Sequence, residues 1–183
     1  MLEKYLVAHC SPTLAGLKSA NIFSYSFTSI KQLNEQLELC RADLRPKGVS
    51  VRVLRYSGHT ALIYVYRIHR VQEELTRQGV SDFLSSYGYE TDQLDVCLQR
   101  LSLRISSHSE FPHEIGLFLG YPLDDVKGFI KHKGKNSRCS GCWKVYCNEC
   151  EAKKLFARFD KCKAIYHDLF SRGKTVSQLT VTA

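Results

Sequence analysis

Hydrophobic residues recur at helical spacing in three long stretches of the chain. Between residues 29 and 44 an apolar side chain returns every three or four positions, and similar stripes mark residues 91–105 and 149–171. This period places the apolar side chains on one face of an α-helix. The pattern therefore predicts three amphipathic helices, the last of them long and ended by Gly173.

A different pattern between residues 49 and 66 predicts two β-strands. Val51 and Val53 alternate with polar neighbours, and residues 61–66 are rich in β-branched and aromatic side chains. A turn-forming sequence, residues 56–59, separates the two runs, so we expect an antiparallel hairpin. A further short strand is expected at residues 143–146.

Shorter elements are expected in the rest of the chain. Residues 4–9 are expected to be a short strand or an extended lead-in, followed by a helix over residues 13–19 that Ser11 and Pro12 introduce. Residues 21–27 alternate poorly and are expected to form a loop. Short helices are predicted at residues 71–75, 80–87, 111–119 and 123–130. Because no regular βαβ alternation is present, the fold class is α+β, with a small, mainly antiparallel sheet packed with several helices and a long C-terminal helix.

Length and hydropathy favour one globular domain. The chain has 183 residues, 44% of them hydrophobic, which predicts a single domain over residues 1–174. Residues 175–183 lack structure signals and are expected to form a mobile tail. No apolar run reaches the roughly 18 residues of a membrane helix, and the first residues do not resemble a signal peptide. We therefore expect a cytoplasmic protein without a membrane partner, whose eight cysteines are thiols or metal ligands.

The charge of the chain is strongly positive and unevenly distributed. The formal net charge is +8, and residues 127–174 contain 13 Lys or Arg against 4 Asp or Glu. Such a region attracts anions, and nucleic acid remains a candidate partner. The alternative is an ordinary solvated basic face.

Four cysteines follow the spacing C-x2-C-x4-C-x2-C: Cys139, Cys142, Cys147 and Cys150. Four thiolates can complete a tetrahedral zinc site or hold an iron–sulfur cluster. The four residues between the two pairs are fewer than in common zinc ribbons. This segment therefore has three alternative interpretations: it binds zinc, it binds an iron–sulfur cluster, or its thiols carry no metal.

Two short segments contain residues suited to acid–base or nucleophilic chemistry. His113 and Glu114 follow Pro112 at an expected helix start, where the histidine is either a proton donor and acceptor or a partner of the turn. His9 and Cys10 precede the helix expected at 13–19. A cysteine at such a position has a lowered thiol pKa and is a candidate nucleophile; the alternative is an unreactive thiol.

Four segments together resemble one known family: HCSPTLAGLKSANIFS, LIYVYR, FPHEIGLFLGYPLDDVKGFI and GCWKVY. The family is the bacterial Domain of Unknown Function 3793, found in clostridia and other anaerobes. The resemblance implies an anaerobic host and suggests an iron-related or flavodoxin-like redox partner. The family's motifs match His9, Pro12, Thr13, Lys18, Arg67, Pro112, His113, Glu114, Gly120, Tyr121, Pro122, Trp143, Lys144 and Tyr146.

These observations lead to one main functional hypothesis and one alternative. The main hypothesis is a polar pocket with a small anionic ligand, in a small-molecule or cofactor-linked (redox or iron-related) enzyme or binding protein. Its catalytic candidates are His113, Glu114, Cys10 and His9, and its ligand-binding candidates are Arg67, Lys18, Tyr121, Trp143 and Lys144. An arginine at a strand end offers a bidentate grip on carboxylate or phosphate. The alternative is a metal-binding or nucleic-acid-binding accessory protein that uses residues 127–174.

Overall fold

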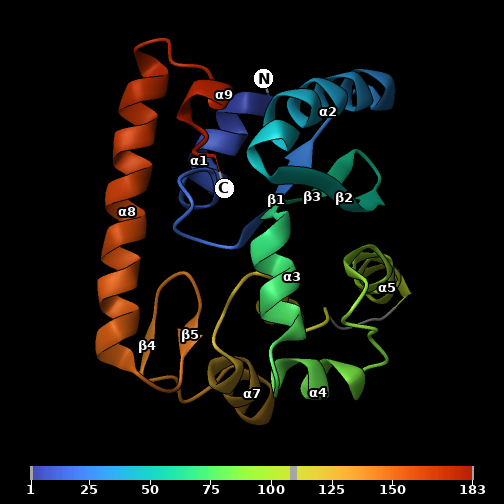
Figure 1. Ribbon diagram of the computed structural model, residues 1–183, viewed down its shortest axis with the longest axis vertical. Coiled ribbons are helices and arrows are strands. Elements are labelled where there is room, and N and C mark those ends of the chain that lie inside the picture. The colour runs from blue at the N-terminus through green and yellow to red at the C-terminus, as the bar shows by residue number, and fades with distance from the viewer. Residues whose placement is uncertain (1, 108–110, 183) are drawn as a thin grey trace. The chain divides into compact units, whose positions relative to one another are not determined.

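The computed structural model describes residues 2–107 and 111–182. They form an α+β fold with a small antiparallel sheet and a long C-terminal helix, α8 (Glu149–Ser171), which confirms the predicted fold class (Figure 1). The chain divides into two compact units. The first contains the described residues up to 71 and those from 162 onward; the second contains those from 72 to 161.

The sheet of the first unit has three antiparallel strands in the order β1–β3–β2. They are β1 (Ala20–Ser26), β2 (Val49–Ser57) and β3 (Thr60–Arg67). β2 and β3 form the predicted hairpin, with an irregularity in register beside Leu54. The loop expected at residues 21–27 is instead mostly strand β1. Phe23 and Tyr25 are buried while Ser24 and Ser26 are exposed, the alternation typical of a half-buried strand.

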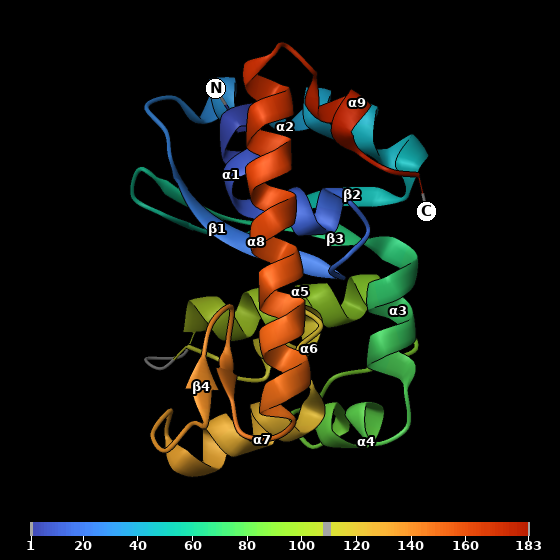
Figure 2. The same ribbon diagram turned by 90° about the vertical axis from the view of Figure 1, so that its left-hand side faces the viewer.

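Helices α1 (Leu2–Leu14), α2 (Ile30–Leu44) and the short α9 (Val176–Leu179) lie on one side of this sheet, as Figure 2 shows. A 3-10 turn, η1 (Arg45–Lys47), connects α2 to β2. Buried side chains of α1 and α2 form the core of the first unit together with Ile63 and Val65 of β3.

Helix α1 replaces the strand and later helix expected near the N-terminus. Leu2, Leu6, Cys10 and Leu14 are buried and recur every four residues, which is helical spacing. Pro12 lies inside this helix instead of beginning one, and its missing N–H leaves one backbone hydrogen bond unformed.

The segment expected to be a mobile tail, from residue 175, contains the short helix α9. Thr175 and Gln178 form a capping box at the start of α9, and Val176 and Leu179 are buried. The ammonium of Lys47 donates to the carbonyl oxygens of Ser177 (2.5 Å) and Thr180 (3.0 Å). Local sequence signals miss this docking because its partners lie about 130 positions earlier.

The second unit is mainly helical. It contains α4 (Val80–Ser85), α5 (Leu94–Ser107), α6 (Ile115–Phe118), α7 (Leu123–His132) and a hairpin of two short strands, β4 (Cys139–Ser140) and β5 (Lys144–Val145). Helix α3 (Ile68–Thr76) begins in the first unit, and α8 begins in the second. No helix in the described part of the chain is both long and apolar enough to cross a membrane.

Candidate functional site

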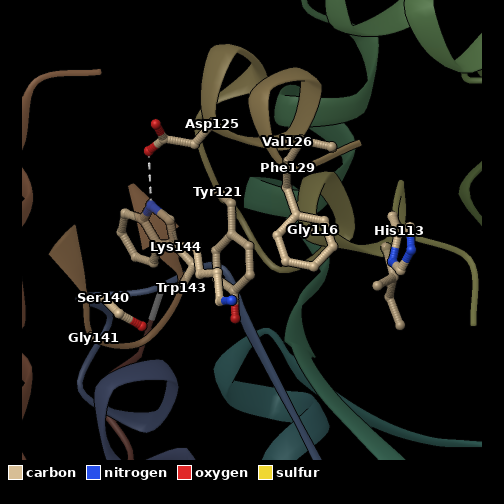
Figure 3. Close-up of a pocket in the computed structure, with 11 residues that line it drawn as sticks. His113, Gly116, Tyr121, Asp125, Val126, Phe129, Ser140, Gly141, Trp143 and Lys144 are labelled. Atoms are coloured by element: carbon tan, nitrogen blue, oxygen red, sulfur yellow. Dashed lines mark hydrogen bonds between the residues drawn. The ribbon is translucent and has the colours of Figure 1, made fainter. Parts of the chain in front are cut away.

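A pocket of about 320 Å³ lies in the second unit, where the α6–α7 segment faces the β4–β5 hairpin (Figure 3). Aromatic rings, glycines and a few polar side chains line it: His113, Ile115, Gly116, Tyr121, Asp125, Val126, Phe129, Ser140, Gly141, Trp143 and Lys144. A concave site with apolar walls and few polar groups is the usual form of a small-molecule site.

The turn between α6 and α7 determines where these side chains lie. Gly120 has a φ of 74°, a left-handed conformation that glycine adopts without strain. Gly116 allows α6 and α7 to pack closely, because a Cβ at this position would lie 2.8 Å from Cγ2 of Val126. The amide of Tyr121 donates to the carbonyl of Gly116 (2.9 Å), which fixes the tyrosine at the pocket wall.

Asp125, in the first turn of α7, fastens the hairpin to this helix. Its Oδ2 accepts a 2.8 Å hydrogen bond from the indole of Trp143. Its Oδ1 accepts from the amides of Tyr146 (2.7 Å) and Cys147 (3.0 Å), and from the Cys147 thiol. The carboxylate is buried, so these four donors replace the water that it loses.

The aromatic walls consist of two ring pairs. Trp143 stacks on Tyr121 with ring centroids 4.8 Å apart, and it makes a T-shaped contact with Phe156 at a centroid distance of 4.6 Å. His113 contacts the ring of Phe129 at 4.9 Å. Figure 3 shows Trp143 and His113 at opposite ends of the drawn pocket, with Tyr121 and Phe129 between them.

Tyr121 and Lys144 contribute polar groups that are partly committed to the backbone. The Tyr121 hydroxyl donates to the carbonyl of Cys142 (3.1 Å), and burial raises the pKa of this phenol to about 12. The Lys144 ammonium donates to the carbonyl of Gly134 (2.6 Å), just after the end of α7. An ammonium carries three donors, so two remain for water or a ligand.

Glu114 does not share the pocket with His113, although the two were predicted to act as a pair. Glu114 is buried and forms an ion pair with Arg104 of α5. Its Oε1 also accepts from the hydroxyl of Tyr89 (3.0 Å). Burial raises the pKa of Tyr89, and the neighbouring Glu114 carboxylate raises it further. His113 is exposed and lines the pocket, so adjacent residues have separate surroundings.

Cys10 and His9 lie in α1 of the first unit, away from any helix start. Cys10 is fully buried, and this burial raises the pKa of its thiol far above the ordinary value. The prediction of an activated nucleophile therefore does not match its surroundings, which keep the thiol protonated. His9 is exposed and stacks on Phe23 with centroids 5.4 Å apart.

Arg67 was expected to bind an anion, but backbone carbonyl groups occupy its guanidinium. Nε donates to Thr13 (2.7 Å), and Nη2 donates to Leu14 (2.7 Å) and Val181 (2.8 Å). Arg67 thus caps the C-terminal end of α1 and holds the C-terminal segment in place. Lys18 is also buried in the first unit.

The four cysteines of the predicted metal site lie in and around the β4–β5 hairpin. Cys139 is in β4, Cys142 in the turn, and the exposed Cys150 in the first turn of α8. The Cys147 thiol donates to Asp125; burial, and then this carboxylate, raise its pKa to about 11. Among the described residues, no three His, Cys, Asp or Glu side chains are arranged to hold a metal ion. Zinc or iron–sulfur binding therefore gains no support from the geometry.

The sequence predicts part of this pocket but does not mark Asp125 or Phe129, which also line it. His113, Tyr121, Trp143 and Lys144 were all singled out, and all four line the pocket. Asp125 has a sufficient local explanation as a favourable charge at the start of α7, so the sequence alone does not mark it as part of a site. Phe129 carries no distinctive sequence signal, because an aromatic residue in an amphipathic helix is typical of an ordinary core.

These features define an α+β protein with an aromatic pocket on its helical unit. The chain matches the family model described as "Protein of unknown function (DUF3793)" over residues 6–180. It therefore belongs to that family, as the resemblance of its motifs indicated. No curated protein and no solved structure matches the chain significantly.

Proposed function

We propose that the protein binds a small anionic molecule in the pocket between the α6–α7 segment and the β4–β5 hairpin. The observation that carries this proposal is the combination of aromatic walls with the Lys144 ammonium in one concavity of about 320 Å³. This volume lies at the lower end of the range of small-molecule sites.

The charges around the pocket favour an anion over a cation. Asp125 already accepts four hydrogen bonds, including that from Trp143, so its carboxylate oxygens have little capacity left to bind a cation. The Lys144 ammonium donates one of its three N–H groups to the carbonyl of Gly134, so the others can bind an acidic group. The net charge of +8 adds a favourable long-range field for anions.

His113 places an imidazole, a side chain that can both donate and accept a proton, in the lining of the pocket. We assign any acid–base step to it and not to Glu114, because that carboxylate is committed to Arg104 and Tyr89. Cys10, Lys18 and Arg67 are given no role in this pocket. We also propose a cytoplasmic location, because all eight cysteines are free thiols.

Calorimetric titration with acetate, benzoate, inorganic phosphate and adenosine monophosphate tests the proposal. Trp143 is the single tryptophan of the chain and lines the pocket, so its fluorescence is a second readout of binding. We expect at least one of these anions to bind and to change this fluorescence.

A pair of lysine variants tests whether the anion lies where we propose. Lys144→Met should weaken binding roughly tenfold or more, the value of a charge-assisted hydrogen bond. Lys131→Met, which removes the same charge from an exposed site on α7, should bind like the parent. Equal affinities of the two variants, or no response to any of the four anions, would overturn the proposal.

A further inference from the structure

We propose that the anionic ligand has a flat aromatic ring and that this ring packs against the aromatic walls of the pocket. The inference rests on the proposed function and adds the chemical class of the ligand. Two ring pairs, Tyr121 with Trp143 and His113 with Phe129, border the same space. Aromatic rings prefer offset-stacked or edge-to-face contacts with other rings.

Hydrogen bonds within the protein hold two of these rings, Trp143 and Tyr121. The indole N–H of Trp143 donates a 2.8 Å hydrogen bond to Asp125, and the ring of Phe156 packs against the indole with centroids 4.6 Å apart. The hydroxyl of Tyr121 is bound to the carbonyl of Cys142. A rigid aromatic surface loses little conformational entropy on binding, so it favours a rigid, flat partner over a flexible one.

Two glycines line the pocket at positions where no side chain would fit. A Cβ at Gly116 would lie 2.8 Å from Val126 and 3.1 Å from Tyr121, and a Cβ at Gly141 would collide with the ring of Phe156. Both glycines line the pocket, so backbone replaces side chains at these points. These two positions of the wall therefore present backbone and no side chain to a ligand.

An aromatic pocket can also hold a quaternary ammonium group. The charges argue against that class here, because Lys144 is cationic and the carboxylate of Asp125 is already occupied by four donors. The volume of about 320 Å³ suits one ring or a fused pair of rings with a single acidic group.

Four probes of similar size separate the effect of a flat aromatic ring from the effect of the ligand's charge. Naphthalene-2-carboxylate is flat and anionic, decalin-2-carboxylate is anionic but not flat, naphthalene-2-methanol is flat but neutral, and (naphthalen-2-ylmethyl)trimethylammonium is flat and cationic. We expect calorimetry to show naphthalene-2-carboxylate binding about tenfold tighter than each of the others, given the contributions of stacking and of a charged hydrogen bond.

Two phenylalanine variants locate the ring. Phe129→Leu should weaken naphthalene-2-carboxylate about two- to tenfold while leaving decalin-2-carboxylate unchanged, since one aromatic contact is lost. Phe83→Leu is the control, because Phe83 lies in α4 and does not line the pocket.

Each remaining outcome has a distinct meaning. Equal binding of the two carboxylates would overturn the aromatic inference and leave the anion site standing. Preference for the ammonium probe would overturn both. If none of the four probes binds, the aromatic inference fails, and the four-anion titration with the lysine variants decides the proposed function separately.

Discussion

The indole nitrogen of Trp143 donates a 2.8 Å hydrogen bond to Oδ2 of Asp125, 18 positions earlier in the chain. The other carboxylate oxygen of Asp125 accepts from the backbone amides of Tyr146 and Cys147. One buried carboxylate therefore sets both the orientation of the pocket's tryptophan and the position of the segment that follows β5. The shape of the pocket depends on this residue even if no ligand touches it.

Asp125→Asn should destabilise the protein by about 1–3 kcal/mol. The asparagine NH2 group replaces one accepting oxygen, so it faces groups that are themselves hydrogen-bond donors and leaves them without an acceptor. The emission of Trp143 should also shift to longer wavelength as the indole loses its fixed position. Urea unfolding and fluorescence spectra measure the two effects.

Asp124→Asn is the matched control for this substitution. Asp124 is the exposed neighbour in the same first turn of α7, so it shares the favourable helix-dipole position but not the buried contacts. Its loss should cost at most about 1 kcal/mol and leave the emission of Trp143 unchanged. Equal effects of the two variants would show that the helix dipole, and not the hairpin contact, explains Asp125.

Gly128→Ala should destabilise the protein, although alanine normally stabilises a helix relative to glycine by about 1 kcal/mol. A Cβ at Gly128 would lie 2.5 Å from Cγ and 2.7 Å from Cβ of Tyr146, and the Cβ atom cannot move away unless the backbone moves with it. We expect a net loss of about 1–3 kcal/mol by urea unfolding, as for other overpacked sites.

A double-mutant cycle with Tyr146→Ala tests the cause of this loss. Removal of the ring eliminates the contact with Cγ, so Gly128→Ala should cost less in the Tyr146→Ala background. An unchanged cost in that background would mean that the clash with the ring is not responsible.

Local periodicity was sufficient to predict the long elements. The helices near residues 29–44 and 149–171 and the hairpin at 49–66 follow from side-chain spacing alone, because each buries one continuous face. The N-terminal helix was missed for a specific reason. Pro12 normally favours the first turn of a helix, but here it lies in the last turn of α1, whose buried leucines recur every four residues.

The pocket was only partly predictable, because its contacts join residues far apart in sequence. Asp125 had a complete local explanation as a helix-start residue, and its partners lie 18 to 22 positions later. His113 and Glu114 looked like a pair because they are neighbours in sequence. The direction of each side chain depends on tertiary packing: Glu114 reaches Arg104 in α5, and His113 reaches Phe129 in α7.

Arg67→Lys should destabilise the protein by about 2 kcal/mol or more, because a lysine cannot reproduce the three hydrogen bonds to backbone carbonyls. Urea unfolding measures this loss, and Arg70→Lys, at an exposed position, is the control. The affinity of the folded variant for its anion should equal that of the parent. A large loss of affinity with unchanged stability would instead support the original prediction that Arg67 binds the ligand.

Removal of metal ions should leave the stability of the protein unchanged. In the described part of the chain no three metal-ligating side chains are grouped, so we expect metal binding to contribute nothing to the free energy of folding. Dialysis of anaerobically purified protein against a chelator, followed by thermal unfolding and elemental analysis, measures this. One equivalent of zinc or iron, with a lower melting temperature after chelation, would show that Cys139, Cys142, Cys147 and Cys150 rearrange around a metal.

Stability should fall as the pH rises from 9 toward 11, in part because of Cys97. Burial in α5, and then the nearby charges of Glu90 and Asp92, raise the pKa of this thiol from 9.0 to about 11. The folded protein therefore holds this proton more tightly than the unfolded chain does. The resulting stabilisation is complete below pH 9 and is lost as the pH passes through the folded-state pKa.

Cys97→Ala should lose roughly 1–3 kcal/mol less stability than the parent across this interval. Urea unfolding at several pH values measures the difference, with Cys150→Ala, at an exposed thiol, expected to follow the parent curve. Identical pH profiles for Cys97→Ala and the parent would show that this thiol ionises equally in both states.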